Sequence, residues 1–365
     1  MATSKISGAR VVGLASAVPQ AVGTVAQAFS VFGEAETLKI SESTGVRRWH
    51  VAPPGVCASD LCSAAAERLL EELNWARDSI EGLIFVSQTP DYFLPASSCS
   101  LHGRLRLSKH CAAFDVNLGC SGYLYGLWLA SQLIQTRTAR RVLLLVGDTI
   151  RRFVSPQDRS VALLFGDAGT ATALEADENT PPISFSLGTD GSGQDNLMVR
   201  AGGVRHPRTD ATGRRIAQDD GSARSEEDLY MNGAEVFTFT LREVPPLFKS
   251  ILSLAGWSWD DVDAVVMHQA NRFMLEFLAK RMRLPLEKVI LDLENRGNTS
   301  SASIPLAITD ALAPQLKVRS LRMILAGFGV GYSWGAAALT CGPMVVPDLV
   351  FVETLAGVPL SKGDS

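Results

Sequence analysis

The sequence reads LLEELNWARDSIEGLIFVSQT at residues 69–89 and KSILSLAGWSWDDVDAVVMHQ at residues 249–269. Trp75 of the first stretch matches Trp257 of the second at an offset of 182 residues, and the acidic residues that follow keep the same offset. Each stretch has an amphipathic helical pattern and then a short apolar run. Because the offset is half the chain, we predict a duplicated domain, with chance similarity between two helix–turn–strand units as the alternative.

A second pair of stretches supports the same division. RRVLLLVGD at residues 140–148 and SLRMILAGFG at residues 320–329 both place a basic residue before an apolar run. Such short, nearly all-apolar runs are typical of strands buried on both faces of a parallel sheet, and helical patterns lie between them. We therefore predict a layered α/β fold with an N-terminal half at 1–180, a polar connection at 181–230 and a C-terminal half at 231–365.

Composition excludes several classes of protein. The 365 residues are 46% hydrophobic with a mean hydropathy of +0.13, which indicates a packed chain and not a disordered one. The formal net charge is −4, so a sequence-independent nucleic-acid binder is not expected. None of the six cysteines forms a C-x-x-C pair, and no metal site is expected. With no signal peptide and no apolar run of membrane-spanning length, we expect a soluble cytoplasmic protein without a membrane span.

The segment at residues 200–228 differs from the rest of the chain. It holds six Arg and six Asp or Glu and almost no large apolar side chain. This composition predicts a solvated loop or cover. Docking of a carrier protein by its arginines is the alternative.

Cys120 is the first candidate for chemistry. It follows a glycine in DVNLGCSGYLYGLWLASQ, residues 115–132, just where an amphipathic helix is predicted to begin. The unpaired N–H groups and the positive dipole end of a helix favour a thiolate over a thiol. The pattern thus favours a nucleophile, and the alternative is an inert buried cysteine.

His268 and Asn298 are predicted to join Cys120. His268 ends the apolar run VDAVVMHQ, and the carboxyl ends of strands gather functional groups in open α/β folds. By the 182-residue offset Cys120 corresponds to Ala302, four residues after Asn298. The two corners are therefore equivalent places in the two halves, and a pseudo-twofold axis would bring Cys120, His268 and Asn298 to one site.

The glycine-rich stretch AGFGVGYSWG at residues 326–335 predicts a turn with exposed backbone N–H groups, suited to binding an oxyanion. It also matches G-x-S-x-G at Gly331–Gly335. A serine hydrolase would need a histidine later in the chain, and none follows position 268, so we reject that interpretation.

Taken in order, the motifs resemble those of the β-ketoacyl-acyl-carrier-protein synthase III family of the thiolase superfamily. The matching pieces are STGVRR (43–48), DVNLGCSGY (115–123), DRSVALLFGDAG (158–169), MNGAEVF (231–237), HQAN (268–271), RGNTSSASIP (296–305) and GFGVGYSWG (327–335). The resemblance spans nearly the whole chain. It implies a thiolase-like fold of duplicated βαβαβαβ halves in five layers, αβαβα, and a homodimer.

The resemblance also implies a decarboxylative condensation without a cofactor. An acyl-CoA or acyl-carrier-protein thioester would load Cys120, and malonyl-acyl carrier protein (or malonyl-CoA) would then lose carbon dioxide and attack the acyl group. The backbone N–H groups of Cys120 and Val330 would hold the oxyanion of acyl transfer, and His268 and Asn298 would hold the enolate.

Substrate contacts implied by the resemblance are less closely matched. The positions are Arg159, Asn271, Phe328 and Leu94. Lys39 and Ser43 stand where family members commonly carry a Trp and an Arg for CoA, and Val330 replaces a usual Gly. These departures favour a longer or carrier-bound acyl group.

Other functions of the same fold stay open. One alternative is an acyltransferase that passes the acyl group to an alcohol or amine without decarboxylation, and another is a catalytically silent partner of a related synthase. A degradative thiolase would need a second cysteine where Phe328 stands.

Overall fold

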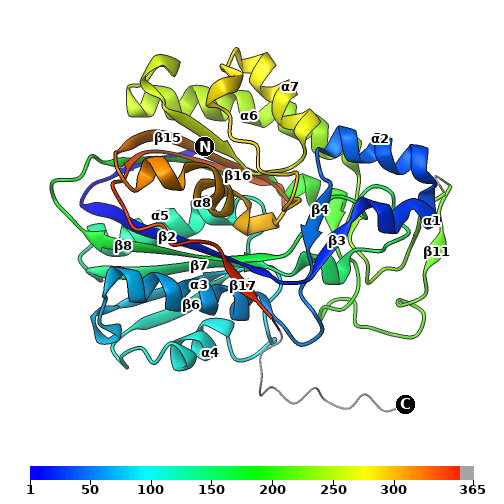
Figure 1. The fold of residues 1–365 in the computed structure, drawn as a ribbon, viewed down its shortest axis with the longest axis horizontal. Coiled ribbons are helices and arrows are strands. Elements are labelled where there is room, and N and C mark those ends of the chain that lie inside the picture. Colours follow the sequence, from blue (N-terminus) through cyan, green and yellow to red (C-terminus); the bar gives the residue numbers. More distant parts are fainter. Residues whose placement is uncertain (220, 354–365) are drawn as a thin grey trace.

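The computed structural model describes residues 1–219 and 221–353 and contains two mixed β-sheets separated and flanked by helices (Figure 1). The first sheet has the order β17 (Val350–Val352), β2 (Ala9–Pro19), β8 (Ala168–Ala176), β7 (Arg141–Asp148), β5 (Gly82–Val86) and β6 (Ala112–Val116). The second has the order β1 (Ala2–Ile6), β9 (Ile183–Thr189), β16 (Ser333–Cys341), β15 (Leu321–Gly329) and β14 (Ala264–Met267).

The two sheets repeat one topology. The order β2-β8-β7-β5 in the first sheet corresponds to β9-β16-β15-β14 in the second. In each, one pair is parallel, β5 with β7 and β14 with β15, and the other two pairs are antiparallel. β5 begins at Gly82 and β14 at Ala264, which are 264 − 82 = 182 residues apart. The predicted duplication is confirmed.

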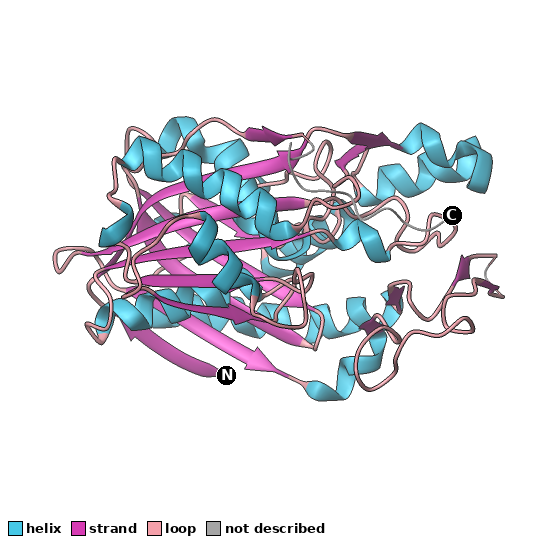
Figure 2. Cartoon of the chain, turned by 90° about the horizontal axis from the view of Figure 1, so that it is seen from below, coloured by secondary structure: helices cyan, strands magenta, loops and turns pink. Residues whose placement is uncertain are grey.

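Helices complete five layers. α5 (Gly122–Gln135) and α8 (Ser303–Leu316) lie between the sheets, and their apolar side chains pack into one central core with both inner sheet faces. α3 (Ala58–Leu73) and α4 (Ser97–Arg104) cover the outer face of the first sheet, and α6 (Gly233–Ala255) and α7 (Arg272–Met282) cover that of the second. Figures 1 and 2 show this layering, and it confirms the predicted αβαβα arrangement.

The apolar runs are explained by burial on both faces of a strand. In β7, Val142 and Leu144 point into the central core, whereas Leu143 and Leu145 pack outward against α3. A strand with helices on both sides needs apolar residues at every position, because neither face meets water.

The remaining short elements lie outside these layers. They are α1 (Phe29–Phe32), α2 (Glu34–Thr44), β3 (Val22–Thr24), β4 (Arg48–His50), β10 (Leu197–Met198), β11 (Ile216–Ala217), β12 (Ala223–Arg224) and β13 (Tyr230–Met231), with seven short 3-10 turns among the described residues. None of the helices within 1–219 and 221–353 is long and apolar enough to cross a bilayer.

The ends of the chain cross between the halves. β1 pairs with β9 in the second sheet, and β17 pairs with β2 in the first. β9 itself falls within the segment 181–230 that we predicted as a connection and forms part of the second sheet. A division at residues 180 and 230 therefore stays a proposal about the organisation of the chain, and the sheets do not follow it strand for strand.

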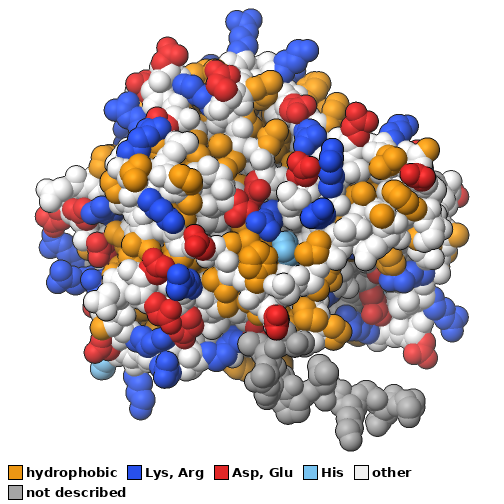
Figure 3. Space-filling model, viewed as in Figure 1, with side chains coloured by type: hydrophobic (Ala, Val, Ile, Leu, Met, Phe, Trp, Pro, Cys, Tyr) orange, Lys and Arg blue, Asp and Glu red, His pale blue; other side chains and the backbone are white. Residues whose placement is uncertain are grey.

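The charged segment at 200–228 is held by local contacts. Its β11–β12 pair rests on residues 155–157, where Ala223 N donates to Gln157 O at 3.0 Å and Ser155 Oγ donates to Ala223 O at 2.7 Å. Its ion pairs are Arg224–Asp158 at 3.0 Å, Arg215–Asp228 at 3.3 Å and Arg208–Glu227 at 3.2 Å. Since these arginines already have carboxylate partners, they offer little free positive charge to a carrier protein. On the face seen in Figure 3, basic and acidic side chains are also intermixed.

Candidate active site

Cys120 lies at the first corner, which we define as residues 119–122 at the start of α5. The side chain is buried, with 8% exposed, and α5 begins two residues later at Gly122. The end of β15 presses against it, because a Cβ atom added at Gly329 would lie 2.7 Å from Cys120 Sγ. One added at Gly327 would lie 2.7 Å from Cys120 O. Glycine is required here to let backbone approach the sulfur.

The protonation state of Cys120 differs from the expected thiolate. Burial raises the pKa of the thiol to about 11, and the carboxylate of Asp148 acts in the same direction. The backbone N–H groups of Val330 and of Cys120 itself lower this pKa but do not offset the burial. The free protein therefore holds mainly a thiol near neutral pH, because loss of hydration outweighs the helix start.

The second corner, which we define as residues 298–303 at the start of α8, carries Asn298. Its side-chain Oδ1 accepts a hydrogen bond from Ser300 N at 2.9 Å, so its Nδ2 faces the opposite way. Nδ2 lies 3.4 Å from Ala270 O and 3.5 Å from His268 Nε2. The predicted His268–Asn298 pair is thus formed, with the amide nitrogen beside the ring.

His268 follows β14 and is buried, with 2% exposed. Burial lowers the pKa of its imidazole to about 4, against a small raising effect of the Ser300 carbonyl. Its Nδ1 lies 2.7 Å from Ser303 Oγ. The ring is therefore neutral at pH 7 and can donate one N–H but carries no full charge.

The end of β15 brings the two corners together. Ala326 O accepts a hydrogen bond from His268 N at 2.7 Å, and the Phe328 ring packs edge-on to the imidazole with centroids 6.1 Å apart. Gly329, one residue later, touches Cys120 Sγ. The structure thus gathers Cys120, His268 and Asn298 around residues 326–330.

Asp148 links the first sheet to the second corner. This fully buried carboxylate ends β7 and accepts hydrogen bonds from Gln88 N at 2.7 Å and from Ser301 Oγ at 2.7 Å. Ser301 belongs to the second corner, whereas β7 belongs to the first sheet. Burial raises the pKa of this carboxyl, and the hydrogen bonds from Ser301 and Gln88 oppose that shift while they fix the geometry around it.

The four predicted substrate-binding residues lie in different surroundings. Phe328 is buried against His268. Asn271 caps α7, its Oδ1 accepting from Met274 N at 2.7 Å. Arg159 forms an ion pair with Glu36 of α2. Leu94 is 86% exposed and does not join the site within one chain.

Ser303 and Asp148 were not predicted from the sequence. Both have a weak signal, since Asp148 is a charged residue ending an apolar strand and Ser303 lies in the polar run NTSSAS. Neither signal says which partner the side chain reaches, because that depends on packing between segments far apart.

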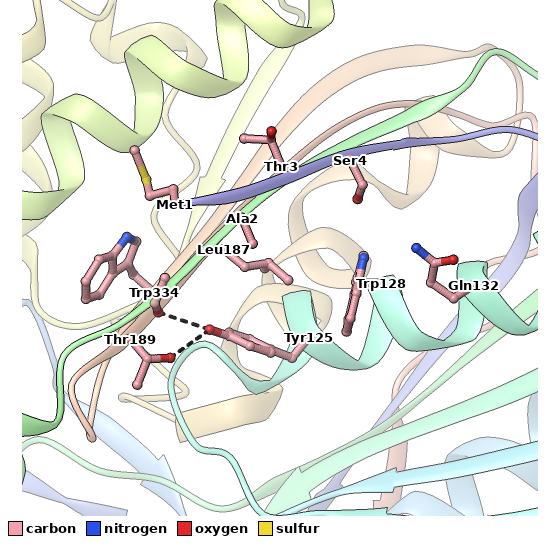
Figure 4. Close-up of a pocket in the computed structure, with 11 residues that line it drawn as sticks. Met1, Ala2, Thr3, Ser4, Tyr125, Trp128, Gln132, Leu187, Thr189 and Trp334 are labelled. Carbon is pink, nitrogen blue, oxygen red and sulfur yellow. Dashed lines mark hydrogen bonds between the residues drawn. The ribbon is translucent and has the colours of Figure 1, made fainter.

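A separate cavity of about 530 Å³ lies beside α5, and none of the three candidate residues lines it (Figure 4). Its walls come from β1, from Tyr125 and Trp128 of α5, and from the end of β9. Tyr125 donates from its hydroxyl to Gly188 O at 3.0 Å and closes one end.

Comparisons with known proteins match most of the chain. Residues 114–191 match the family model described as 3-oxoacyl-[acyl-carrier-protein (ACP)] synthase III, and residues 252–341 match that of its C-terminal part. A β-ketoacyl-[acyl-carrier-protein] synthase III from Roseiflexus sp. (strain RS-1) is 35% identical, covering 91% of this chain and 98% of the relative.

Solved structures agree with these matches. The crystal structure of a 3-oxoacyl-(acyl-carrier protein) synthase from Burkholderia xenovorans LB400 superposes with a TM-score of 0.91 at 45% identity, covering 96% of this chain and 99% of the other. The synthase III from Pseudomonas aeruginosa PAO1 gives a TM-score of 0.79 at 31% identity, with 93% and 100% covered. With the site geometry above, these matches establish that the chain belongs to the 3-oxoacyl-[acyl-carrier-protein] synthase III family of thiolase-like condensing enzymes.

Proposed function

We propose that this acyltransferase, which condenses acyl thioesters with malonyl-acyl carrier protein, carries the acyl group on Cys120 and uses His268 and Asn298 in the decarboxylation step. The observation that carries the proposal is the pair of nitrogens, His268 Nε2 and Asn298 Nδ2, set 3.5 Å apart beside the end of β15 that touches Cys120 Sγ. Two neutral donors so placed suit one developing enolate oxygen.

In the loading step, Cys120 Sγ attacks the carbonyl carbon of the donor thioester. The new C–S bond forms as Cys120 loses its S–H proton, the donor's own C–S bond then breaks, and the departing thiolate takes up one proton to leave as a thiol. The N–H groups of Cys120 and Val330, which both act on the sulfur, would bind the oxyanion between these two events.

In the condensation step, the bond between the malonyl carboxylate and its methylene carbon breaks and carbon dioxide leaves. The electron pair passes into an enolate, whose oxygen would accept from His268 Nε2 and Asn298 Nδ2. The methylene carbon then attacks the acyl carbon, a C–C bond forms, and Cys120 leaves as a thiolate that regains a proton. A neutral imidazole suits this role because it can donate without the hydration that a buried cation needs.

The donor is proposed to be a carrier-bound acyl group in preference to acyl-CoA. Glu36 forms an ion pair with Arg159, the residue that the family resemblance assigns to CoA. The positive charge of Arg159 is therefore already partly offset. Lys39 of the same helix α2 stands where the resemblance leads one to expect an aromatic side chain. Both features support weaker binding of a nucleotide.

The enzyme is proposed to act as a cytoplasmic homodimer. The edge strand β6 is only partly buried, and Phe114 and Val116 on it, like Tyr125 and Trp128 of α5, are partly buried side chains packed against the central core. Phe93 and Leu94 stand out from the nearby loop, 79% and 86% exposed. A strand edge flanked by apolar side chains suits pairing with a second copy.

Intact-protein mass spectrometry tests the proposal. The wild type is incubated with a panel of acyl-CoAs and acyl carrier proteins, and release of carbon dioxide from malonyl carrier protein is then measured. We expect an acyl adduct that is lost in Cys120→Ser but kept in the matched control Cys99→Ser, whose thiol is exposed. An adduct that persists in Cys120→Ser contradicts the nucleophile, and acyl transfer without carbon dioxide release contradicts the condensation step.

A further inference from the structure

The imidazole of His268 is held by a hydroxyl group that the steps above do not use. Ser303, the first residue of α8, is buried with 2% exposed, and its Oγ lies 2.7 Å from His268 Nδ1. We propose that Ser303 is a positioning residue that donates its hydroxyl proton to Nδ1 and thereby keeps the ring proton on Nε2, beside Asn298. The proposal rests on the role proposed above for His268.

The direction of this hydrogen bond follows from counting protons. A serine hydroxyl has one proton to donate and two lone pairs. Gln269 N donates to Ser303 Oγ at 3.3 Å and occupies one lone pair. Among residues 1–219 and 221–353, the only other hydrogen-bond partner of this oxygen is His268 Nδ1. If Nδ1 carried the ring proton, the hydroxyl proton would be left buried without an acceptor, which is unfavourable.

Gln269 makes the arrangement rigid. Its side-chain Nε2 donates to Met267 O at 2.8 Å and to Ile290 O at 3.1 Å, and its Oε1 accepts from Asp292 N at 2.7 Å. The backbone N–H that reaches Ser303 is thus fixed at the end of β14. Ser303 Oγ therefore keeps accepting a hydrogen bond from Gln269 N.

The position of the single ring proton matters because the ring is neutral. Burial lowers the pKa of His268 to about 4, so near pH 7 only one of its nitrogens bears a proton. Asn298 Nδ2, 3.5 Å from Nε2, is a donor whose orientation Ser300 N fixes through Oδ1. A donor at that place would by itself favour a bare Nε2. The hydroxyl of Ser303, donated to Nδ1 on the other side of the ring, opposes that preference.

The consequence concerns the enolate. With the proton on Nε2, His268 and Asn298 offer two N–H groups to one oxygen. With the proton on Nδ1, Nε2 would instead accept from Asn298 and the oxygen would lose a donor. Ser303 thus acts on the condensation step through His268 and not on the loading of Cys120.

Nitrogen NMR of protein labelled with 15N-histidine tests the proposal at pH 7. The chain has five histidines, and loss of one set of signals in His268→Asn assigns the ring. We expect a one-bond 15N–1H coupling at Nε2 and none at Nδ1. In Ser303→Ala we expect the proton to be shared between both nitrogens and kcat for condensation to fall about tenfold with loading of Cys120 unchanged, and Ser303→Thr to restore both.

A matched control is Ser16→Ala. Ser16 is equally buried and shares a 2.7 Å hydrogen bond with Thr309 Oγ1 of the same helix α8, without contact to His268. It should leave the ring proton and condensation unchanged.

Each outcome decides a separate point. A proton on Nδ1 in the wild type overturns the role of Ser303, and this measurement holds even if Ser303→Ala does not fold. A Ser303→Ala enzyme identical to the wild type in both readouts overturns it as well. A shifted proton with undiminished condensation supports the Ser303 hydrogen bond and overturns the role proposed for His268.

Discussion

The first and second corners occupy equivalent places in the two halves but differ in the contacts that hold their side chains. Next to Cys120 Sγ, glycine backbone comes so close that Gly329 would clash with the sulfur if it carried a side chain. Around Asn298 the neighbours are hydroxyl, amide and carboxylate groups joined by hydrogen bonds. The same duplicated fold thus confines Cys120 by close backbone contact and orients Asn298 and His268 by hydrogen bonds.

The largest effect should come from breaking the second corner. In His268→Ala one of the two proposed donors to the enolate is lost, and such losses cost about 3 kcal/mol, or roughly 100- to 1,000-fold in rate. We expect that loss in release of carbon dioxide from malonyl carrier protein, with loading of Cys120 within about tenfold of the wild type. Stopped assays of each step measure the split, and an equal fall in both steps would contradict the separation of roles.

Breaking the first corner should give the next largest effect. Gly329→Ala puts a methyl group 2.7 Å from Cys120 Sγ at a backbone φ of +157°, which only glycine adopts readily. We expect alkylation and acyl loading of Cys120 to fall about 10- to 100-fold and the free energy of unfolding to fall by about 1–3 kcal/mol. Gly103→Ala, where an added Cβ meets nothing within 4 Å, is the control. Unchanged alkylation would show that the sulfur is free to move.

The pH dependence of alkylation tests the protonation state of Cys120 in the first corner. Since burial raises the pKa of Cys120 to about 11, the thiolate fraction should rise about tenfold for each pH unit between 7 and 9. Iodoacetamide labelling, followed by mass spectrometry in a Cys99→Ser background, measures the rate. A plateau above pH 7 would mean that the helix start and the two backbone N–H groups prevail over burial.

The smallest effect concerns a site outside both corners. Glu36→Gln removes the partner of Arg159, and because this ion pair is partly exposed we expect KM for acyl-CoA to fall by only about two- to fivefold. Glu34→Gln on the same helix is the matched control, and steady-state kinetics with acyl-CoA and acyl carrier protein compare the donors. A rise in KM for acyl-CoA would contradict the proposed competition between Glu36 and a nucleotide.

Much of the fold could be predicted because strands buried on both faces leave a plain apolar pattern. The runs containing β5, β7, β14 and β15 gave the duplication, and the 182-residue offset placed Cys120 and Asn298 at equivalent corners. That symmetry brought distant residues to one site without any knowledge of their contacts. The resemblance to the family then supplied the chemistry.

The rest depended on packing that no local pattern records. His268 and Ser303 are 35 residues apart within the C-terminal half, and Asp148 and Ser301 are 153 apart in different halves, so both hydrogen bonds exist only once distant segments have packed together. The raised pKa of Cys120 could not be predicted either, because a helix start is visible in sequence and the depth of burial is not. Leu94 stays exposed in a single chain, and its predicted contact with substrate would need a second one.

The N-terminal strand β1 belongs to the second sheet and the C-terminal strand β17 to the first, which limits how the chain can be divided into fragments. Separate expression of residues 1–180 and 181–365 would strand β1 in a fragment that lacks its partner β9, and would leave β2 with an open edge where β17 belongs. Each fragment would then carry an open sheet edge and a short terminal strand without its partner, which invites aggregation before the fragments meet. Each half therefore needs the other's terminal strand to complete its sheet, and a cut at residue 180 would separate both of these strands from their sheets although it falls in an exposed loop.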